Sequence, residues 1–438
     1  MEQKPQDNLE QIFKKYYSAH MQGRLLEAEK GYREILKTRP EWGQVLNALG
    51  NLYLDQERPE KAKPVFEKAV HLNPPDLSAC YNLGRLKQLE TDHQGAIVIY
   101  TRMLDQQPNI GQVWNNQGVA YRELGKLDDA VASFRSAVRF APEMAEAWNN
   151  LGVAQDELDL TENALNSYKK AIEIQPDYLS PHLNLGLLLQ KSEQFKAAEE
   201  HYNQVLKIEP DNEVARFMLQ SMGGDETPDA APVEHVRSIF DQCAENFETI
   251  LVKGLEYKTP ELLFNLVRPC LTENMSILDL GCGTGLGAHL YRPFAKSLTG
   301  VDVSAKMLKK ASEKKIYNRL EVFDILQDWV FPTKFDLIYS SDVFVYFGNL
   351  DMILKSASSY LVNGGTIAFS VEKLKGNTTN YQLYPSGRYA HSEKYIEECL
   401  NRHELKTIEI SKTDIRNQSG NPVKGLLLVA KKNFILPG

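Results

Sequence analysis

The chain has 438 residues, a length that is typical of two or three domains, each with its own hydrophobic core. Charged residues make up 25% of it and hydrophobic residues 42%, as in ordinary globular proteins. The formal net charge of −8 argues against a general nucleic-acid binder, because the surface of such a protein is basic. We therefore expect a multidomain globular protein without a nucleic-acid partner.

The N-terminus, MEQKPQDNLE, is polar and charged, so it does not have the pattern of a secretory signal. No apolar run is long enough to span a bilayer, and we expect no membrane partner. The five cysteines are scattered and form no Cys-x-x-Cys pair. This pattern predicts a reducing, cytoplasmic compartment and no metal site.

Residues 9–212 repeat with a step of 34 residues. The step is kept by glycine (Gly50, Gly84, Gly118, Gly152, Gly186), by proline (Pro40, Pro74, Pro108, Pro142, Pro176, Pro210) and by alanine (Ala28, Ala62, Ala96, Ala130, Ala164, Ala198). An aromatic residue follows each alanine by four places, which is helical spacing. The repeat therefore predicts a stack of helical hairpins. We expect the glycine to let the two helices of a unit approach, the aromatic ring to fill the gap to the next unit, and the proline to end the second helix.

The segment WNNQGVAYRELGKLDDAVASFRSAVRFAP (114–142) resembles the tetratricopeptide repeat (TPR) nearly throughout. The resemblance implies an all-α solenoid over residues 1–222, with a capping helix at 213–222. Six units are expected, at 9–42, 43–76, 77–110, 111–144, 145–178 and 179–212. The first unit is atypical, with Tyr16 where later units have glycine, as expected of a terminal repeat.

Four asparagines, Asn82, Asn116, Asn150 and Asn184, occupy one position in successive units. The family geometry implies that this position lines the concave surface. A primary amide both donates and accepts, so a ladder of amides could bind the backbone of an extended peptide. The arrangement resembles the asparagine ladder of O-linked N-acetylglucosamine transferase. The alternative is that these amides are satisfied by water or by a neighbouring helix.

A segment rich in glycine, proline and acidic residues, GGDETPDAAP, begins at residue 223 and predicts an exposed linker over 223–234. From residue 235 to 438 the 34-residue step is absent, and short apolar segments alternate with helical patterns. Strands are expected at 276–280, 297–302, 319–323, 335–340, 365–371, 405–412 and 424–431. This alternation predicts an α/β, Rossmann-like domain with a mainly parallel sheet, and the turn-rich segment before 424 predicts a final antiparallel hairpin.

The stretch SILDLGCGTG (276–285) ends a predicted strand in three alternating glycines, and Asp302 closes the next strand. This spacing fits a relaxed dinucleotide fingerprint, so NAD is one candidate ligand. Asp279, two residues before the first glycine, instead favours a ligand with an ammonium and a sulfonium, because a carboxylate there would repel a pyrophosphate. Asp324, just past the third strand, could accept a hydrogen bond from an adenine amino group.

Together with FDLIYSSDVFVYF (335–347) and LVNGGTIAFSVE (361–372), these segments resemble the class I S-adenosylmethionine-dependent methyltransferases over about 235–432. The resemblance implies S-adenosylmethionine as cofactor. It implies that the glycines lie under the methionine part, that Asp302 holds the ribose and that Asp324 faces the adenine. The implied cofactor-binding residues are Asp279, Gly281, Cys282, Gly283, Gly285, Asp302, Val303, Met307, Asp324, Ile325 and Ser340. The two halves together resemble a bacterial group of methyltransferases with N-terminal TPR repeats.

Methyl transfer to oxygen or nitrogen can need a base, and His391 and Tyr346 are our catalytic candidates. Arg388 could bind a carboxylate or phosphate of the acceptor. Phe240, Phe247 and Tyr257 could form a lid over the cofactor or belong to the core. The lysine-rich run at 304–315 reads as a solvated helix face.

We therefore expect a methyltransferase whose repeats recruit a protein substrate or partner. One alternative is a small-molecule methyltransferase that uses its repeats for assembly. A second is a TPR adaptor whose cofactor-binding domain does not turn over.

Overall fold

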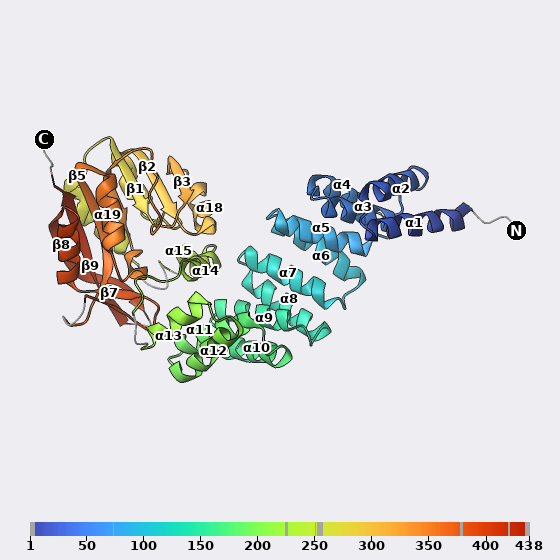
Figure 1. The fold of residues 1–438 in the computed structure, drawn as a ribbon, viewed down its shortest axis with the longest axis horizontal. Helices are drawn as coiled ribbons and strands as arrows, with labels where there is room; N and C mark the ends of the chain where they lie inside the picture. The colour runs from blue at the N-terminus through green and yellow to red at the C-terminus, as the bar shows by residue number, and fades with distance from the viewer. Residues whose placement is uncertain are drawn as a thin grey trace. The chain divides into compact units, whose positions relative to one another are not determined.

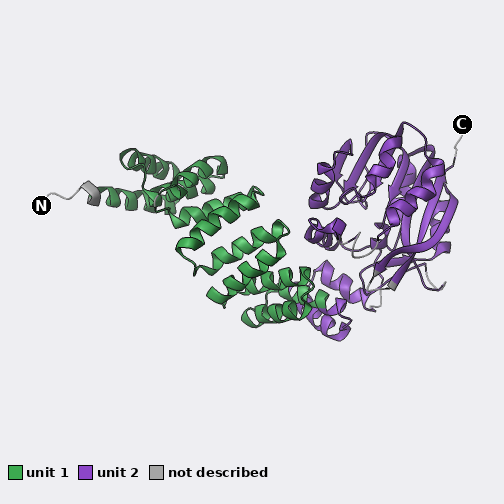
Figure 2. Ribbon diagram, turned by 180° about the vertical axis from the view of Figure 1, so that it is seen from behind, with its two compact units in different colours: residues 1–188 green, residues 189–438 purple. Residues whose placement is uncertain are grey.

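The computed structural model describes residues 5–72, 74–223, 227–249, 251, 257–376, 380–418 and 421–433. Two compact units make up the chain, residues 1–188 and 189–438 (Figure 2). The division falls inside helix α11 (Leu179–Lys191), which lies before the linker expected at 223–234. Helices α12 (Phe195–Ile208) and α13 (Glu213–Ser221) thus belong to the second unit. The functional domain limits stay a prediction.

The N-terminal region is a series of antiparallel helix pairs, as the 34-residue step predicted (Figure 1). Each pair has one helix on either side of a tight turn, and α13 follows the last pair. The first five pairs are α1 (Pro5–Met21) and α2 (Leu25–Thr38), α3 (Gly43–Asp55) and α4 (Pro59–Val70), α5 (Leu77–Leu89) and α6 (His93–Gln106), α7 (Gly111–Glu123) and α8 (Leu127–Phe140), and α9 (Ala145–Glu157) and α10 (Thr161–Ile174).

Close approach of the two helices within a pair depends on the repeated glycine. A Cβ atom on Gly50 of α3 would lie 2.3 Å from Phe66 Cε1 of α4, so no larger residue fits there. The same contact joins Gly84 to Tyr100 in the next pair. The ring thus packs on the glycine of its own unit, a contact that the sequence did not predict, and its role toward the neighbouring unit stays a prediction.

The first helix pair keeps this contact with the partners exchanged. Tyr16, which stands on α1 where later units have glycine, packs on Gly31 of α2. A Cβ atom on Gly31 would lie 2.1 Å from the Tyr16 ring. The atypical first unit is therefore a packed helix pair and not an unstructured leader.

The second unit contains a nine-stranded sheet in the order β3-β2-β1-β4-β5, with later strands added beyond β5. The first five strands are parallel: β1 (Met275–Leu280), β2 (Ala295–Asp302), β3 (Arg319–Val322), β4 (Phe335–Ser340) and β5 (Leu361–Lys373). Strand order reverses between β1 and β4, which is the position where such sheets bind ligands. The doubly wound fold expected from the sequence is confirmed.

The far edge of the sheet includes two short strands that the sequence did not predict, β6 (Tyr381–Leu383) and β7 (Tyr389–His391). The predicted final hairpin is present as β8 (Leu405–Gln418) and β9 (Asn421–Lys432), which pair antiparallel to each other. Strand β9 also pairs antiparallel with β5.

Helices between the strands complete the fold. They are α14 (Val233–Cys243), α15 (Phe247–Thr249), α16 (Thr259–Val267), α17 (Ala288–Tyr291), α18 (Ala305–Glu313), α19 (Asp351–Tyr360) and α20 (Glu393–Arg402). Leu263 and Val267 of α16 pack with Ile277, Leu337 and Val429 of the sheet in one buried cluster.

Residues 227–232, within the expected exposed linker, are hydrogen-bonded to the second unit. The Asp229 carbonyl accepts from the Gly348 amide at 2.7 Å, and the Ala231 amide donates to the Tyr346 carbonyl at 2.8 Å. The Tyr389 hydroxyl donates to the Pro228 carbonyl at 2.8 Å. This stretch is therefore part of the α/β fold.

Two findings bear on the expected environment of the protein. The five cysteines, all inside the described ranges, form no disulfide. No helix in the part of the chain that the structure describes is both long and apolar enough to cross a membrane.

Candidate functional site

A cavity of about 150 Å³ lies at the carboxyl ends of β1, β2 and β4, where the strand order reverses. Four strand-end loops line it, at 281–287, 302–303, 323–325 and 341–347. Residues from α14 to Leu251 cover it, and Arg388 reaches it from the turn between β6 and β7. The cavity is therefore built by segments that are far apart in the sequence.

The glycine loop after β1 depends on a backbone conformation that favours glycine. Gly281, Gly283 and Gly285 have φ angles of +76°, +53° and +74°. A Cβ atom on Gly281 would lie 2.3 Å from Val343, whereas on Gly283 the nearest atom is Phe247 Cε1 at 3.6 Å. Gly283 therefore leaves open space beside the cavity, where a ligand can approach the backbone.

Asp302, at the end of β2, connects this loop to the next one. Its Oδ2 accepts from the Gly283 amide at 2.8 Å, and its Oδ1 accepts from the Ser304 amide at 2.9 Å. Burial raises the pKa of the Asp302 carboxyl, while these amides oppose the shift. The residue predicted to hold a ribose thus also orders the loop under the cofactor.

Asp279 is buried at the base of the cavity, where two tyrosines bind it. The hydroxyls of Tyr317 and Tyr339 both donate to its Oδ2 at 2.6 Å. Tyr339 is held in turn by stacking on Tyr291, with ring centroids 3.8 Å apart. Burial raises the pKa of Asp279 to about 7, although the two tyrosines lower it. A cation in the cavity would favour the ionised carboxylate.

Seven of the eleven predicted cofactor-binding residues line the cavity: Asp279, Gly281, Cys282, Gly283, Asp302, Val303 and Ile325. Phe323, beside Ile325, also lines it and was not predicted. Burial raises the pKa of the Cys282 thiol well above its usual value, so this cysteine is an unreactive wall residue.

The other four predicted residues lie outside the cavity lining, and three of them make contacts that shape the loops. Ser340 Oγ donates to the Leu280 carbonyl at 2.7 Å and joins β4 to β1. Met307 is fully buried on α18. Asp324 Oδ1 accepts from the Leu326 amide at 3.0 Å, and Gly285 packs against Tyr317.

Phe240, Phe247 and Tyr257 all line the cavity, which favours the lid interpretation for these aromatics. Phe240 meets Phe247 edge-on at 5.9 Å and Tyr346 at 5.8 Å. Together these rings form an apolar cover on one side of the cavity.

Ion pairs attach this cover to α18. Lys310 pairs with Glu245 at 2.6 Å, and Lys314 pairs with Glu248. Glu248 also accepts from the Thr284 hydroxyl of the glycine loop at 2.7 Å. The lysine-rich run at 304–315, expected as a solvated face, therefore helps to hold the cover closed.

The structure does not bring His391, the first catalytic candidate, to the cavity. His391 is fully buried on β7, and its Nε2 lies 2.8 Å from the Phe347 carbonyl and 3.1 Å from the Gly348 carbonyl. Two carbonyl partners require Nε2 to be the protonated donor. Burial lowers the pKa of His391 to about 4. Its geometry is that of a neutral hydrogen-bond donor inside the protein, which corrects its prediction as a base.

Tyr346, the second catalytic candidate, lines the cavity, with the Arg388 guanidinium 5.9 Å from its ring centre. Arg388 lies 3.9 Å from a Glu372 carboxylate oxygen. Although burial opposes it, the charges of Tyr346, Asp342 and Glu372 raise the pKa of Arg388. Arg388 is therefore a permanent cation in the wall of the cavity.

Asp342, two residues after the end of β4, lines the cavity. Its φ of +61° is unusual for a residue other than glycine, and its amide donates to Ser370 Oγ at 2.7 Å. Its Oδ2 accepts from Arg416 at 2.9 Å, while its Oδ1 is buried without a partner among the described residues. Arg416 also binds Glu372. A strained, oriented carboxylate with an unpaired oxygen is suited to accept a proton from a substrate.

The sequence contains a signal for Asp342, because this residue closely follows a buried strand in the segment YSSD. No such signal pointed to Arg416, because it lies 74 residues further along the chain.

The four ladder asparagines lie half-buried, one on each of α5, α7, α9 and α11. Three of them donate to asparagines of the preceding helix pair: Asn82 to Asn47 at 3.0 Å and Asn51 at 2.8 Å, Asn150 to Asn115 at 3.0 Å, and Asn184 to Asn149 at 3.1 Å. Asn116 accepts from Gln112 of its own helix at 3.2 Å. Three of the four amides therefore connect successive repeats, which agrees with the alternative that a neighbouring helix satisfies them.

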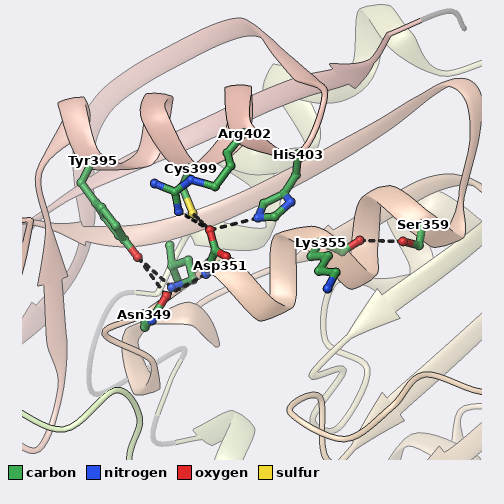
Figure 3. Close-up of polar contacts among 9 residues, drawn as sticks. Asn349, Asp351, Lys355, Ser359, Tyr395, Cys399, Arg402 and His403 are labelled. Atoms are coloured by element: carbon green, nitrogen blue, oxygen red, sulfur yellow. Dashed lines mark hydrogen bonds and ion pairs between the residues drawn. The ribbon is translucent and has the colours of Figure 1, made fainter.

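The described residues contain one group of side chains with metal-ligating types, Asp351, Cys399 and His403. Figure 3 shows that Arg402 converges on Asp351 beside His403. Arg402 and His403 both donate to Asp351 Oδ1, and Cys399 lies 3.5 Å from it. Burial raises the pKa of the Cys399 thiol to about 12, which disfavours a thiolate ligand. This group is an ion-pair network between α19 and α20.

Comparison with known proteins identifies both parts of the chain. Residues 255–409 match the family model described as a methyltransferase domain. Tetratricopeptide repeat models match residues 43–76, 81–145, 115–178 and 181–212.

Curated relatives match the methyltransferase region at low identity. A probable S-adenosylmethionine-dependent methyltransferase, CRG1, of Saccharomyces cerevisiae is 26% identical over 133 residues, covering 28% of this chain and 45% of that protein. A malonyl-[acyl-carrier protein] O-methyltransferase of Hamiltonella defensa is 31% identical over 175 residues, covering 40% of this chain and 64% of that protein. The chain spans about half the length of the curated relatives it matches.

Among solved structures, an S-adenosylmethionine-dependent methyltransferase from Clostridium acetobutylicum has 18% identity and a TM-score of 0.35, covering 44% of this chain and 99% of that one. The TPR protein YrrB has 19% identity and a TM-score of 0.39, covering 42% and 95%.

The curated relatives include proteins from yeast and from bacteria, so the bacterial grouping stays a prediction. The curated relative named as a probable S-adenosylmethionine-dependent methyltransferase agrees with the cofactor predicted from the sequence. The chain thus carries a methyltransferase domain preceded by tetratricopeptide repeats.

Proposed function

We propose that this protein transfers a methyl group from S-adenosylmethionine to an acceptor, and that its repeats recruit a protein or peptide that is, or delivers, the substrate. The observation that carries the first half is a glycine loop that leaves backbone exposed beside two buried carboxylates, Asp279 and Asp302. A ligand with an ammonium, a sulfonium and a ribose complements these groups, whereas the pyrophosphate of NAD would be repelled.

The chain's own residues take distinct parts in this proposal. Asp279 holds the ammonium of the methionine part, and Asp302 holds the ribose hydroxyls while it orders Gly283. Ile325 packs on the adenine, with Asp324 nearby as a hydrogen-bond acceptor. The aromatic cover from Phe240 excludes water, which would otherwise compete with the acceptor.

S-adenosylmethionine, when bound, supplies a methyl group activated by its sulfonium for in-line displacement. The protein adds proximity and alignment, which are its main contribution to such a reaction. Arg388 orients the acceptor, and Asp342 Oδ1 takes the proton if the acceptor atom carries one. Tyr346 forms the wall between these two groups.

The proposed role of the repeats rests on the ladder of amides at Asn82, Asn116, Asn150 and Asn184. Hydrogen bonds to the preceding helix pair hold three of these amides in place, so little side-chain entropy is lost when a peptide binds. Stacked helical repeats form an extended concave surface, which suits a peptide or protein partner. A cytoplasmic location remains part of the proposal, based on the scattered cysteines.

Calorimetric titration of S-adenosylmethionine and, separately, NAD into the full chain tests the cofactor. We expect binding of S-adenosylmethionine alone and a loss of at least about tenfold in affinity in Asp302→Ala, because a charge-assisted hydrogen-bond acceptor is removed. The exposed Asp328→Ala variant is the matched control. Binding of NAD, or no difference between the two variants, would contradict the proposal.

Transfer of a labelled methyl group to an extract of the source cells tests the role of the repeats. We expect label in protein, and a large loss of that label in the triple variant of Asn116, Asn150 and Asn184 to alanine, with cofactor affinity retained. Label in small molecules that is unaffected by the triple variant would favour a small-molecule methyltransferase. Cofactor binding without labelled product would favour an adaptor.

A further inference from the structure

Helix α13 and the end of α11 contact the turn that carries Arg388, all within the second unit (Figure 2). This turn spans residues 384–388 and is closed by two hydrogen bonds, from the Tyr384 amide to the Arg388 carbonyl and from the Gly387 amide to the Tyr384 carbonyl, both 2.9 Å. It lies between β6 and β7, which the sequence did not predict. The orientation of Arg388 therefore depends on what holds this turn.

A buried amide binds the turn directly. Gln190 Nε2, at the end of α11, donates to the Pro385 carbonyl at 2.5 Å. Gln190 is 7% exposed, and its amide is oriented by the Tyr202 hydroxyl, which donates to Oε1 at 2.7 Å, and by Ser221 Oγ at 3.0 Å. Because Tyr202 and Ser221 both bind the Gln190 amide, the direction of its hydrogen bond to the Pro385 carbonyl is fixed.

An apolar contact holds the other side of the turn. A Cβ atom on Gly387 would lie 3.5 Å from Met218 Cε and 3.6 Å from Phe217 Cε1, so the side chains of α13 lie beside the turn. The centroid of the buried Phe217 ring lies 6.3 Å from that of the Tyr389 ring and 5.7 Å from that of the His235 ring.

His235 belongs to α14, the helix that sends Val236 and Phe240 into the cavity. It is 7% exposed, and burial lowers its pKa to about 4, so it packs as a neutral ring. Phe217 therefore touches two walls of the cavity, the Arg388 turn and the cover helix.

Within the described residues, Arg388 contacts Tyr346 and lies 3.9 Å from a Glu372 oxygen, and these two contacts can use only part of its donor set. The two carboxylates beside it, Asp342 and Glu372, are both bound by Arg416. A guanidinium has five N–H donors in a planar fork, which suits a carboxylate, phosphate or carbonyl oxygen of the acceptor.

We propose that Gln190 and Phe217 are positioning residues for methyl transfer: they hold the 384–388 turn so that Arg388 presents its guanidinium to an anionic or carbonyl oxygen of the acceptor. The last helices of the repeat series are thus part of the acceptor wall. This proposal rests on the proposed function, because it assigns the wall of the methyl-transfer cavity.

Hydrogen exchange followed by mass spectrometry on the full chain tests the proposal without a known acceptor. The variants are Gln190→Met, which keeps the volume but removes the amide, and Phe217→Ala, with Phe217→Leu as the conservative variant. The control is Phe195→Ala, which removes a 39% exposed ring from α12. A second readout is the rate at which phenylglyoxal modifies Arg388.

We expect the peptide covering 384–391 to exchange about tenfold faster in Gln190→Met and Phe217→Ala, with Arg388 modified faster. Phe217→Leu should restore most of the protection, and Phe195→Ala should match the natural chain. The β1 peptide, 275–280, should exchange as before, because the loss of protection is local to the turn.

Unchanged exchange at 384–391 in both variants would overturn the proposal, and so would faster exchange spread evenly over the second unit, which would indicate general destabilisation. Failure of the natural chain to bind S-adenosylmethionine would contradict the proposed function instead. The two failures are therefore separate results.

Discussion

The Gly283 amide donates a 2.8 Å hydrogen bond to Asp302 Oδ2, so the loop after β1 and the end of β2 form one rigid element of the cavity. Nineteen residues separate these two positions in the chain. Because the parallel pairing of β1 with β2 sets Asp279 opposite Gly300, the loop that follows β1 must pass beside Asp302. The first prediction concerns the open face of this loop.

Gly283→Ala should weaken S-adenosylmethionine binding by at least about tenfold, because its Cβ atom would occupy the space beside Phe247 that a ligand needs. A left-handed φ also costs an alanine roughly 1–2 kcal/mol. Gly376→Ala is the matched control, since Gly376 has a φ of +95° and no neighbour within 4 Å of the added atom. Calorimetry and thermal melting of both variants separate the two effects, and equal loss of binding in both would contradict the prediction.

Cofactor affinity should rise with pH through about 7, the pKa to which burial raises Asp279. A cationic ligand binds the ionised carboxylate better, so binding displaces a proton below that pH and none well above it. Titrations from pH 5.5 to 8.5 in buffers of different ionisation enthalpy measure this proton release. Proton release should disappear in Asp279→Asn. A cofactor affinity that does not change with pH in the natural chain would contradict the role of Asp279.

In the ligand-free protein, Asp279 should have the opposite effect: stability falls as the pH rises, whereas cofactor affinity increases. The folded pKa of Asp279 is raised above the ordinary value of 3.8, so between about 4 and 7 the folded state binds more protons than the unfolded state. Its contribution to the free energy of unfolding is therefore present in acid and is lost as the pH rises through about 7.

His391→Ala should destabilise the fold by roughly 2–4 kcal/mol, because it removes buried volume and leaves two carbonyls without their donor. Cofactor affinity should change less than about twofold. The folded pKa of about 4 lies below the ordinary histidine value of 6.5, so stability from this residue falls as the pH drops from about 6.5 to 4. Urea denaturation at a series of pH values across this window should show that the free energy of unfolding falls less steeply toward acid in His391→Ala than in the natural chain. His391→Gln keeps an amide donor and should be less destabilised.

Asp342→Asn should reduce methyl transfer by roughly 10²–10⁴-fold while the chain still binds S-adenosylhomocysteine, because an amide has the shape of the carboxylate but cannot accept the proton. The readout is the rate of label transfer to the acceptor fraction found in the cell extract. Asp328→Asn provides an exposed control in the same unit. Transfer at the natural rate by Asp342→Asn would exclude it as the base.

Asp351→Asn should lower stability by less than about 1 kcal/mol, because this carboxylate is one-third exposed and its ion pairs are screened. Although burial acts in the opposite direction, hydrogen bonds from His403 and Arg402 hold the pKa of Asp351 below its usual value. This stability is therefore present above the unfolded pKa and is lost as the pH falls through the folded one.

Thermal melting with added Zn²⁺ or with a chelator should give the same midpoint, because Arg402 occupies the oxygen that a metal would need. A rise in the midpoint with Zn²⁺ that is lost in Cys399→Ser would instead identify a metal site.

Much of the fold could be predicted from the sequence because its determinants are local. The 34-residue step of Gly50 and its equivalents sets the helix pairs, since each glycine meets an aromatic ring of the adjoining helix. The strand–glycine–strand order around Gly281 and Asp302 likewise depends on short-range spacing and on the φ angles that glycine allows. These features determined the two folds, the cofactor class and most of the residues at the glycine loop.

Only the tertiary structure decided the acceptor side of the cavity, because its groups come from distant segments. Arg416 on β8 orients Asp342. Arg388 lies on a turn whose Pro385 accepts a hydrogen bond from Gln190, although the two residues are 195 positions apart in the chain. His391 has the residue type of a base, but burial under the Phe347 and Gly348 carbonyls makes it a donor inside the protein. Burial and contacts with distant residues determine the charge and orientation of such side chains, and neither can be predicted from the local spacing of residues in the sequence.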